Sequence, residues 1–399
     1  MKIHGTGCGI VDCIYTNEDF SGPSYRAALS KKSGDGGLGY GTLVFSDALE
    51  AFTGRNYDDA LAELTGGKKP SVMNLGGPSL VSLIHAAQSL AALSGAYQVR
   101  FFGVRGNDDA GNFFEEKLRL LPLAASLLPK NAPHSRTDAL SDPRWENGAG
   151  ERSFVYRKGA SELFTPDDLD GAFFDADVIA FGGTALTPQL HARLTELLKR
   201  AKQKAVTIVN LVYDFGGEAA APGQKWKLGA NDDAYPYIDL LLADQEEAVK
   251  TSGRKNAGKA AEWFLEQGCG AAAITRGKEP VIFAANEGLF RKTKPARLPV
   301  CEAVGRELAE HPERRGDTTG CGDNFTGALI GALSQALAEG GRGGIDLRSL
   351  IPCAVAAGGF ACFYAGGVYY EQAAGEKRRL LARYLEAYQR QINNPAASG

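Results

Sequence analysis

The amino-acid sequence predicts an α/β protein in which helices cover both faces of a mostly parallel sheet. Short apolar runs typical of buried strands recur along the chain, and helical patterns follow several of them. The 399 residues are 44% hydrophobic and 23% charged, an ordinary globular composition that allows a sizeable core. Two long segments of different composition interrupt the alternation and predict insertions into one domain.

Five short apolar runs carry the strand prediction: 99–104, 178–181, 205–211, 238–243 and 271–275. Helix-like segments follow the first two runs at 111–121 and at 188–201, where leucines recur on one face. A further helix is expected to end near Gln267, just before the last run. In a sheet of this kind, ligands bind at the carboxyl ends of the strands.

The two interrupting segments are residues 14–45 and about 130–155. The first is rich in Gly, Ser and Tyr and contains the run Gly34–Gly41, and the second is polar with several turn-forming residues. Loops this long are commonly lids or binding loops. We therefore predict a single domain over residues 1–390 with both segments inserted as a lid, followed by a disordered tail at 391–399.

Charge and cysteine usage restrict the class of protein. The net charge of −3 argues against a general binder of nucleic acid or of anionic membranes. The seven cysteines are odd in number and lack C-x-x-C spacing, which predicts reduced thiols and a cytoplasmic protein. The N-terminus lacks the apolar run of a signal peptide. The uncharged stretch Ser349–Tyr370 contains Pro352 and many Ala and Gly residues, which favours a tightly packed helix over a membrane span.

The segment Gly316–Leu329, GDTTGCGDNFTGAL, is the most informative part of the chain. A loop with two glycines opens a helix, and the free N–H groups and dipole of a helix start bind anions. Gly320 and Gly322 let the backbone approach a phosphoryl group closely. Asp323 lies at the same helix end, where it is either a general base for an alcohol or simply a helix-capping residue.

The same segment closely resembles the C-terminal signature of the PfkB, or ribokinase-like, carbohydrate kinases. This resemblance implies a three-layer sandwich with a mostly parallel central sheet and a small β lid. It also implies that Asp323 is the catalytic base and that Gly320, Cys321 and Gly322 form the anion hole. The implied activity is ATP-dependent phosphorylation of a hydroxyl on a sugar, nucleoside or related polyol.

Further segments match the family in the expected order and imply the remaining site. Segment 103–111 resembles the family's G-x-x-G-x-D-x-x-G segment, which leads into a helix, and segment 173–183 resembles a later strand of the family. The substrate residues implied by the resemblance are Asp12, Gly76, Gly77, Gly159 and Ala160. The nucleotide residues implied are Thr275, Gly277, Thr318, Thr319 and Ala356, and the residues implied for Mg²⁺ are Asp244, Glu247 and Asp317. Asp317 and Thr319 would also serve a K⁺ site, and the lid is a candidate homodimer contact.

Three positions depart from the family pattern. Val81 stands where an asparagine contacts substrate hydroxyls, and it can form no hydrogen bond through its side chain. Asp244 replaces the asparagine of the N-x-x-E motif, and the segment Asn210–Asp214 fits the usual D-x-N-x-R strand poorly. A catalytically silent ligand-binding or regulatory protein of the same fold therefore stays open.

A third alternative is a dehydrogenase or methyltransferase, for which the cluster Gly5, Gly7 and Gly9 is the only support. No acidic residue is well placed after a second strand, so this cluster is weak evidence for a dinucleotide site.

Overall fold

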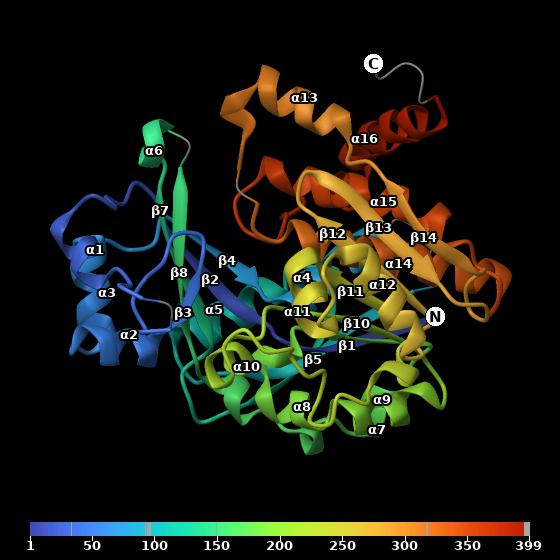
Figure 1. The fold of residues 1–399 in the computed structure, drawn as a ribbon, viewed down its shortest axis with the longest axis horizontal. Helices are drawn as coiled ribbons and strands as arrows, with labels where there is room; N and C mark the ends of the chain where they lie inside the picture. Colours follow the sequence, from blue (N-terminus) through green and yellow to red (C-terminus); the bar gives the residue numbers. More distant parts are fainter. Residues whose placement is uncertain (33, 92, 94–96, 149, 317, 395–399) are drawn as a thin grey trace.

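The computed structural model of the protein describes residues 1–32, 34–91, 93, 97–148, 150–316 and 318–394. The larger sheet in this part of the chain has nine strands in the order β14-β13-β12-β11-β10-β9-β1-β5-β6 (Figure 1). All neighbouring pairs from β6 to β12 are parallel, whereas β13 and β14 are added antiparallel. The strands are β1 (Lys2–Gly7), β5 (Gln98–Arg105), β6 (Ala124–Pro129), β9 (Val178–Gly182), β10 (Val206–Asn210), β11 (Leu240–Asp244), β12 (Ala271–Arg276), β13 (Glu279–Ala285) and β14 (Thr293–Leu298).

Helices cover both faces of this sheet, as the apolar runs predict. Along β11, Leu240 and Leu242 join one hydrophobic core, while Leu241 and Ala243 join the other. The helices on the side of the first core are α4 (Pro78–Ala91), α5 (Asp109–Leu118), α13 (Glu302–Glu310), α14 (Cys321–Gly340), α15 (Leu347–Phe360) and α16 (Glu376–Asn393), and this core also includes residues of the second sheet and its helices. Those of the second are α7 (Gly171–Phe174), α8 (Pro188–Ala192), α9 (Leu194–Lys202), α11 (Gln245–Ser252) and α12 (Ala257–Glu266). A strand buried on both faces needs apolar side chains at every position, which explains the continuous runs.

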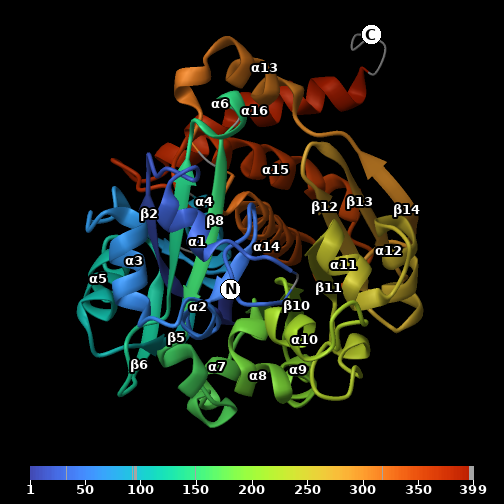
Figure 2. The same ribbon diagram turned by 60° about the vertical axis from the view of Figure 1, so that its left-hand side comes forward.

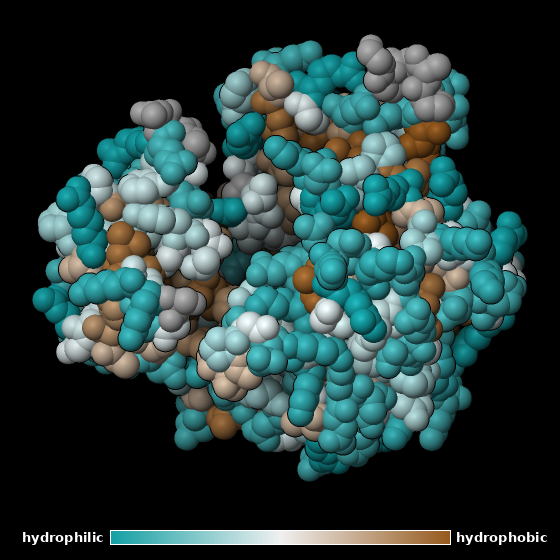
Figure 3. All heavy atoms as spheres, viewed as in Figure 1, coloured by the Kyte–Doolittle hydropathy of each residue, from teal (hydrophilic) through white to brown (hydrophobic). Residues whose placement is uncertain are grey.

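A second, five-stranded sheet stands beside the main body, in the order β3-β8-β7-β2-β4 (Figure 2). Its strands are β2 (Ile10–Tyr15), β3 (Leu43–Phe45), β4 (Val72–Gly76), β7 (Arg136–Asp142) and β8 (Glu151–Arg157). Helices α1 (Pro23–Ala28), α2 (Ser46–Thr53), α3 (Tyr57–Thr65) and α6 (Trp145–Gly148) lie with it (Figure 1). Both predicted insertions contribute strands, and residues 46–76, which were not predicted as part of the lid, also belong here. Figure 3 shows the surface hollowed between this part and the main body.

Several expected boundaries differ from the structure. The single helix expected at 188–201 is divided into α8 and α9, because the backbone at Arg193 leaves the helical conformation. Helix α16 continues to Asn393, so residues 391–393 are helical where we expected a disordered tail, and 395–399 lie outside the described residues. Residues 349–370 include most of α15, which packs against α14 with Pro352 buried. No helix in the described ranges is both long and apolar enough to cross a bilayer.

Two glycines explain how closely the elements approach one another. A Cβ on Gly327 of α14 would lie 2.3 Å from the Ser82 carbonyl oxygen of α4. Gly7 at the end of β1 has a φ of +124°, and a Cβ there would lie 2.0 Å from the Gly182 oxygen. The glycine-rich N-terminal cluster therefore has a packing role at the crossing of β1, β9 and α4, which removes the reason to interpret it as a dinucleotide loop.

Candidate active site

Asp323 lies where two cavities meet. Helix α14 begins after Gly320, whose φ of 77° turns the chain into the helix, and Asp323 is in the first helical turn. The Asp323 side chain lines both a large cavity of about 670 Å³ and a smaller one of about 160 Å³. A carboxylate in this position can contact groups bound on either side of it.

Burial raises the pKa of Asp323 to about 6, and a hydrogen bond from Asn210 partly opposes that rise. Asn210 ends β10, and its Nδ2 donates to Asp323 Oδ1 over 3.4 Å. The Thr326 hydroxyl in turn donates to Asn210 Oδ1 over 3.3 Å. A carboxylate with a pKa just below neutral is mostly ionised at pH 7 and accepts a proton more readily than an ordinary aspartate.

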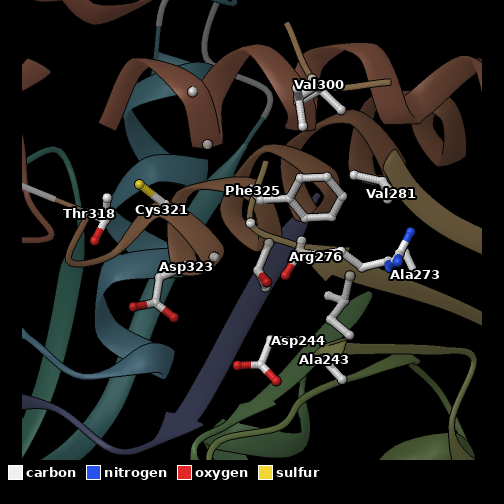
Figure 4. A pocket seen from close by; sticks show the side chains of 18 of the residues that line it. Ala243, Asp244, Ala273, Arg276, Val281, Val300, Thr318, Cys321, Asp323 and Phe325 are labelled. Atoms are coloured by element: carbon white, nitrogen blue, oxygen red, sulfur yellow. The ribbon is translucent and has the colours of Figure 1, made fainter. Parts of the chain in front are cut away.

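The large cavity brings together three segments that the sequence predicts for a nucleotide. These segments line it: Thr275 and Gly277 at the end of β12, Thr318 before α14 with Cys321 and Gly322 at its start, and Val355, Gly358 and Gly359 of α15. Figure 4 shows Thr318, Cys321 and Asp323 at one end of this pocket and the apolar side chains Phe325, Val281 and Val300 at the other. Two predicted nucleotide residues are not among the lining residues: Ala356 is buried, and Thr319 lines the smaller cavity instead. An apolar end and a polar end suit a ligand with a flat ring and a charged tail.

Asp244 and Glu247 face the same cavity from the start of α11. They form a capping box: Asp244 Oδ1 accepts from the Glu247 N–H, and Glu247 Oε2 accepts from the Asp244 N–H, both at 2.8 Å. Burial and the negative charge of Asp244 raise the pKa of Glu247 to about 8, and partial desolvation raises the pKa of Asp244.

These two carboxylates fit a divalent cation. A cation between them would relieve the repulsion that raises the pKa of Glu247. Within the described ranges no group of three or more His, Cys, Asp or Glu side chains could hold a metal alone. Water and phosphate oxygens would have to complete its coordination, as is usual for Mg²⁺. Asp317, the third residue implied for a metal, lies outside the described residues.

The small cavity lies between the second sheet and the main body. Its lining includes Ile10, Asp12, Ile14, Gly77, Val81, Thr137, Phe154, Thr319 and Gly320. Asp12 is only 8% exposed, and a Cβ on Gly76 would lie 2.1 Å from its Oδ2, so this glycine makes room for the carboxylate. Gly159 and Ala160 are not brought to this cavity, because the Ala160 N–H donates to the Pro133 oxygen and holds the segment elsewhere.

Arg152 joins the second sheet to the turn before α14, and no role was predicted for it from the sequence. From β8, its guanidinium donates to the Thr319 hydroxyl over 2.9 Å and to the Thr318 hydroxyl over 2.8 Å. Two nearby basic residues, Arg157 and Lys158, instead pair with Asp58 and Asp47 of the α2–α3 region. Arg152 differs from Arg157 and Lys158 in its contacts with Thr318 and Thr319, which are distant in the sequence.

A buried network of hydrogen bonds stabilises the turn at Gly320, where α14 begins. Asn324 donates through Nδ2 to the Gly320 oxygen over 2.8 Å and to the Gly367 oxygen over 2.9 Å. Its Oδ1 accepts from Lys377 Nζ over 2.8 Å and lies 2.9 Å from His85 Nδ1. Lys377 is 1% exposed, and burial lowers its pKa to about 7. Neither Asn210 nor Lys377 was identified from the sequence, because each acts through a residue distant along the chain.

Known proteins share both the sequence pattern and the fold. A model of the pfkB family of carbohydrate kinases matches residues 84–373. The chain belongs to the PfkB carbohydrate kinase family. Aminoimidazole riboside kinase of Salmonella typhimurium is 23% identical over 289 residues, which span 70% of this chain and 80% of that protein.

Solved structures of PfkB-like kinases share the ribokinase-like fold predicted from the sequence. Adenosine kinase from Sinorhizobium meliloti superposes with a TM-score of 0.67 at 17% identity, covering 96% of this chain and 99% of its own. Ribokinase from Thermotoga maritima has a TM-score of 0.60 at 18% identity, with the same coverage of 96% and 99%. At these identities the likeness establishes the fold, and the arrangement of the site rests on the chain's own residues.

Proposed function

We propose that this PfkB-family protein transfers the terminal phosphoryl group of ATP to a hydroxyl of a sugar, nucleoside or related polyol. The observation that carries the proposal is the position of Asp323, in the first turn of α14 and on the wall shared by the two cavities. Phosphoryl transfer needs a base beside the accepting hydroxyl and donors around the charge that develops. One helix start provides both.

The large cavity is proposed to hold the nucleotide. Its apolar end at Val281, Val300 and Phe325 suits adenine, and the backbone N–H groups of residues 320–322 suit the transferred phosphoryl group. The Arg152 guanidinium lies at the same turn and would add positive charge there. Asp244 and Glu247 would hold Mg²⁺ through water and phosphate oxygens, where it would neutralise phosphate charge.

The small cavity is proposed to hold the acceptor. Asp12 is a carboxylate that can accept hydrogen bonds from two neighbouring hydroxyls, and Asp323 would then accept the proton of the attacking hydroxyl. The relatives act on aminoimidazole riboside, adenosine or, by name, ribose, which supports an acceptor that contains a sugar ring. The second sheet would close over it and exclude water, which would otherwise compete for the phosphoryl group.

Turnover of ATP over a library of sugars and nucleosides, compared between wild type and Asp323→Asn, tests the proposal. Asparagine keeps the size and capping ability of aspartate but cannot accept the proton, so kcat should fall by roughly 10² to 10⁴ while ATP still binds. Asp346→Asn, at the cap of α15, is the matched control and should keep its activity. Near-wild-type turnover by Asp323→Asn would refute the assignment of the base.

The pH dependence gives a second test of the same residue. Since the pKa of Asp323 is about 6, protonation below that value removes the base. We expect kcat to fall as pH drops through about 6 and to be independent of this group above about 7. A rate that is flat between pH 5 and 7 would contradict this expectation.

A further inference from the structure

Two cysteine thiols meet at the wall of the large cavity. Cys321 is the first residue of α14, and Cys362 lies in the 3₁₀ turn Ala361–Phe363 that follows α15. Their sulfur atoms are 3.6 Å apart although the residues are 41 positions apart in the sequence. Both side chains are partly exposed and line the cavity, so dissolved reagents can reach them.

The backbone holds this pair together. A Cβ on Gly358, one helical turn before Cys362, would lie 3.1 Å from the Cys321 oxygen, so the missing side chain lets the end of α15 lie against the start of α14. The Gly316 N–H donates to the Cys362 oxygen over 2.9 Å, which ties the loop before α14 to the same turn. The sulfurs need to approach by only about 1.5 Å to reach the disulfide length of about 2.05 Å.

The other cysteines do not share this environment. Cys8, Cys13, Cys269 and Cys301 are buried, and burial raises the pKa of each of these thiols, which makes them unreactive. Cys353 is partly exposed, and burial raises the pKa of its thiol as well. Cys321, by contrast, starts a helix of 20 residues, where aligned peptide dipoles favour an anion such as a thiolate.

We propose that Cys321 and Cys362 are a redox modification site, at which a peroxide forms a reversible disulfide that inactivates the kinase. A thiolate of the pair attacks the peroxide, takes up one oxygen as a sulfenic acid and, with a proton, releases water. The second thiol then attacks that sulfur, and a second water leaves as the disulfide forms. A dithiol reductant reverses the bond by thiol–disulfide exchange.

The disulfide would act on the proposed anion hole, so its effect on activity rests on the proposed function. Cys321 lies between Gly320 and Gly322, and a covalent bond to the Cys362 turn would pull this part of the phosphoryl-binding turn toward α15. A displacement of about 1 Å at a site of this kind costs roughly 10²-fold in rate. The formation of the bond itself does not depend on any catalytic assignment.

The experiment treats the full-length reduced protein with hydrogen peroxide and follows three quantities: intact mass, the cross-linked peptide, and the ratio of oxidised to reduced activity. Wild type should lose the mass of two hydrogen atoms, give one peptide pair joining Cys321 to Cys362, and lose at least tenfold in activity, recovered by dithiothreitol. Cys353→Ala keeps the pair and should behave like wild type. Cys362→Ala should form no such link, and peroxide should not reduce its activity in the same way. Saturating ATP with Mg²⁺ should slow the reaction, because both thiols line the cavity.

A link between other cysteines, no link at all, or equal inactivation of Cys362→Ala would overturn the proposal. Mass analysis separates this failure from a failure of the proposed function. If the Cys321–Cys362 link forms in a protein that phosphorylates none of the library, the function has failed and the inactivation part of the proposal fails with it. If turnover is normal and the link does not form, only the redox site is wrong.

Discussion

The two cavities on either side of Asp323 are built in different ways. Most residues of the large cavity come from the ends of β10, β11 and β12 and from α14 and α15, which all belong to the main body. Six residues of the small cavity come from strands of the second sheet, namely Ile10, Asp12, Ile14, Thr137, Ala139 and Phe154. The proposed nucleotide side is therefore built from the main body, whereas the proposed acceptor side depends on how the second sheet sits against the main body.

Two of the departures from the family pattern, Val81 and Asp244, lie at different cavities. Val81 lines the small, proposed acceptor cavity, where its side chain offers no hydrogen bond. Asp244 lines the large, proposed nucleotide cavity, where it caps α11 as an asparagine would. These positions predict that Val81 affects the choice of acceptor and that Asp244 affects nucleotide and Mg²⁺ use, and the following variants test that prediction.

Asp12→Asn should have the largest effect of these variants, and it should fall on the acceptor alone. A charge-assisted hydrogen bond contributes about 1.5–3 kcal/mol, so weakening two of them should lower kcat/KM for the acceptor by roughly 10²- to 10³-fold. Steady-state kinetics with each substrate varied in turn measures this. Asp244→Asn is the matched change on the other cavity and should alter Mg²⁺ dependence while the acceptor KM stays the same. A change in ATP KM as large as that in acceptor KM would contradict the division.

Arg152→Met tests a side chain that joins the second sheet to the turn at the start of α14. Removing its hydrogen bonds to Thr318 and Thr319 and its positive charge should lower kcat by roughly 10²-fold, since removing one donor around developing charge costs about 10²- to 10³-fold. Arg157→Met, on the same strand but paired with Asp58, is the control and should keep most of the activity. An equal loss of activity in both variants would indicate that the substitutions disturb strand β8 as a whole.

Val81→Asn should change acceptor preference by about tenfold, the value of one net hydrogen bond. The side chain is 2% exposed and packs against Gly367, so an unpaired amide there should also lower Tm until an acceptor supplies a partner. Ranking the acceptor library by kcat/KM for wild type, Val81→Asn and Val81→Ala checks this. The asparagine variant should favour more hydroxylated acceptors, and the alanine variant should not. The same ranking from both variants would attribute the change to size alone.

Much of the fold, and the meeting of several predicted residues at the large cavity, could be predicted because the evidence is local in sequence. The run at 238–243 predicts a buried strand since both faces of β11 are covered, and the Gly320–Asp323 turn carries its glycines and carboxylate within four positions. The split at Arg193 and the extent of the second sheet were not predicted. Residues 46–76 include the ordinary helices α2 and α3, and only the pairing of β4 with β2 shows that this segment belongs to the second sheet.

The side chains that support the turn could not be predicted because nothing local distinguishes them. Asn210 and Arg152 reach the turn from positions more than 100 residues away. Lys377 lies in a helix whose sequence is rich in charged residues, and one buried lysine among exposed ones has no signature in such a segment. Its position beneath Asn324 is set by the packing of α16 on α4 and α15.

Lys377→Met should have the smallest effect on activity and a distinctive effect on stability. The pKa of Lys377 is lowered to about 7 by burial, while in the unfolded chain it returns to about 10.5. Between these values the unfolded chain binds more protons than the folded one, so this lysine makes stability rise with pH. The neighbouring His85 also has a lowered pKa, caused by burial and then by the charge of Lys377, so its own contribution rises with pH only up to about 6.5.

The two groups can therefore be separated by the pH range in which they act. The Tm of wild type minus that of Lys377→Met should increase as pH rises from 7 to 9. The corresponding difference between wild type and Arg378→Met, which changes an exposed residue of the same helix, should not increase. Activity should fall only a few-fold, because the bonds from Asn324 to the Gly320 and Gly367 oxygens remain. Parallel curves of Tm against pH for wild type and Lys377→Met would show that Lys377 does not titrate in this pH range. In that case the ammonium would stay charged, and its bonds to Asn324 and Gln88 would offset the cost of burying it.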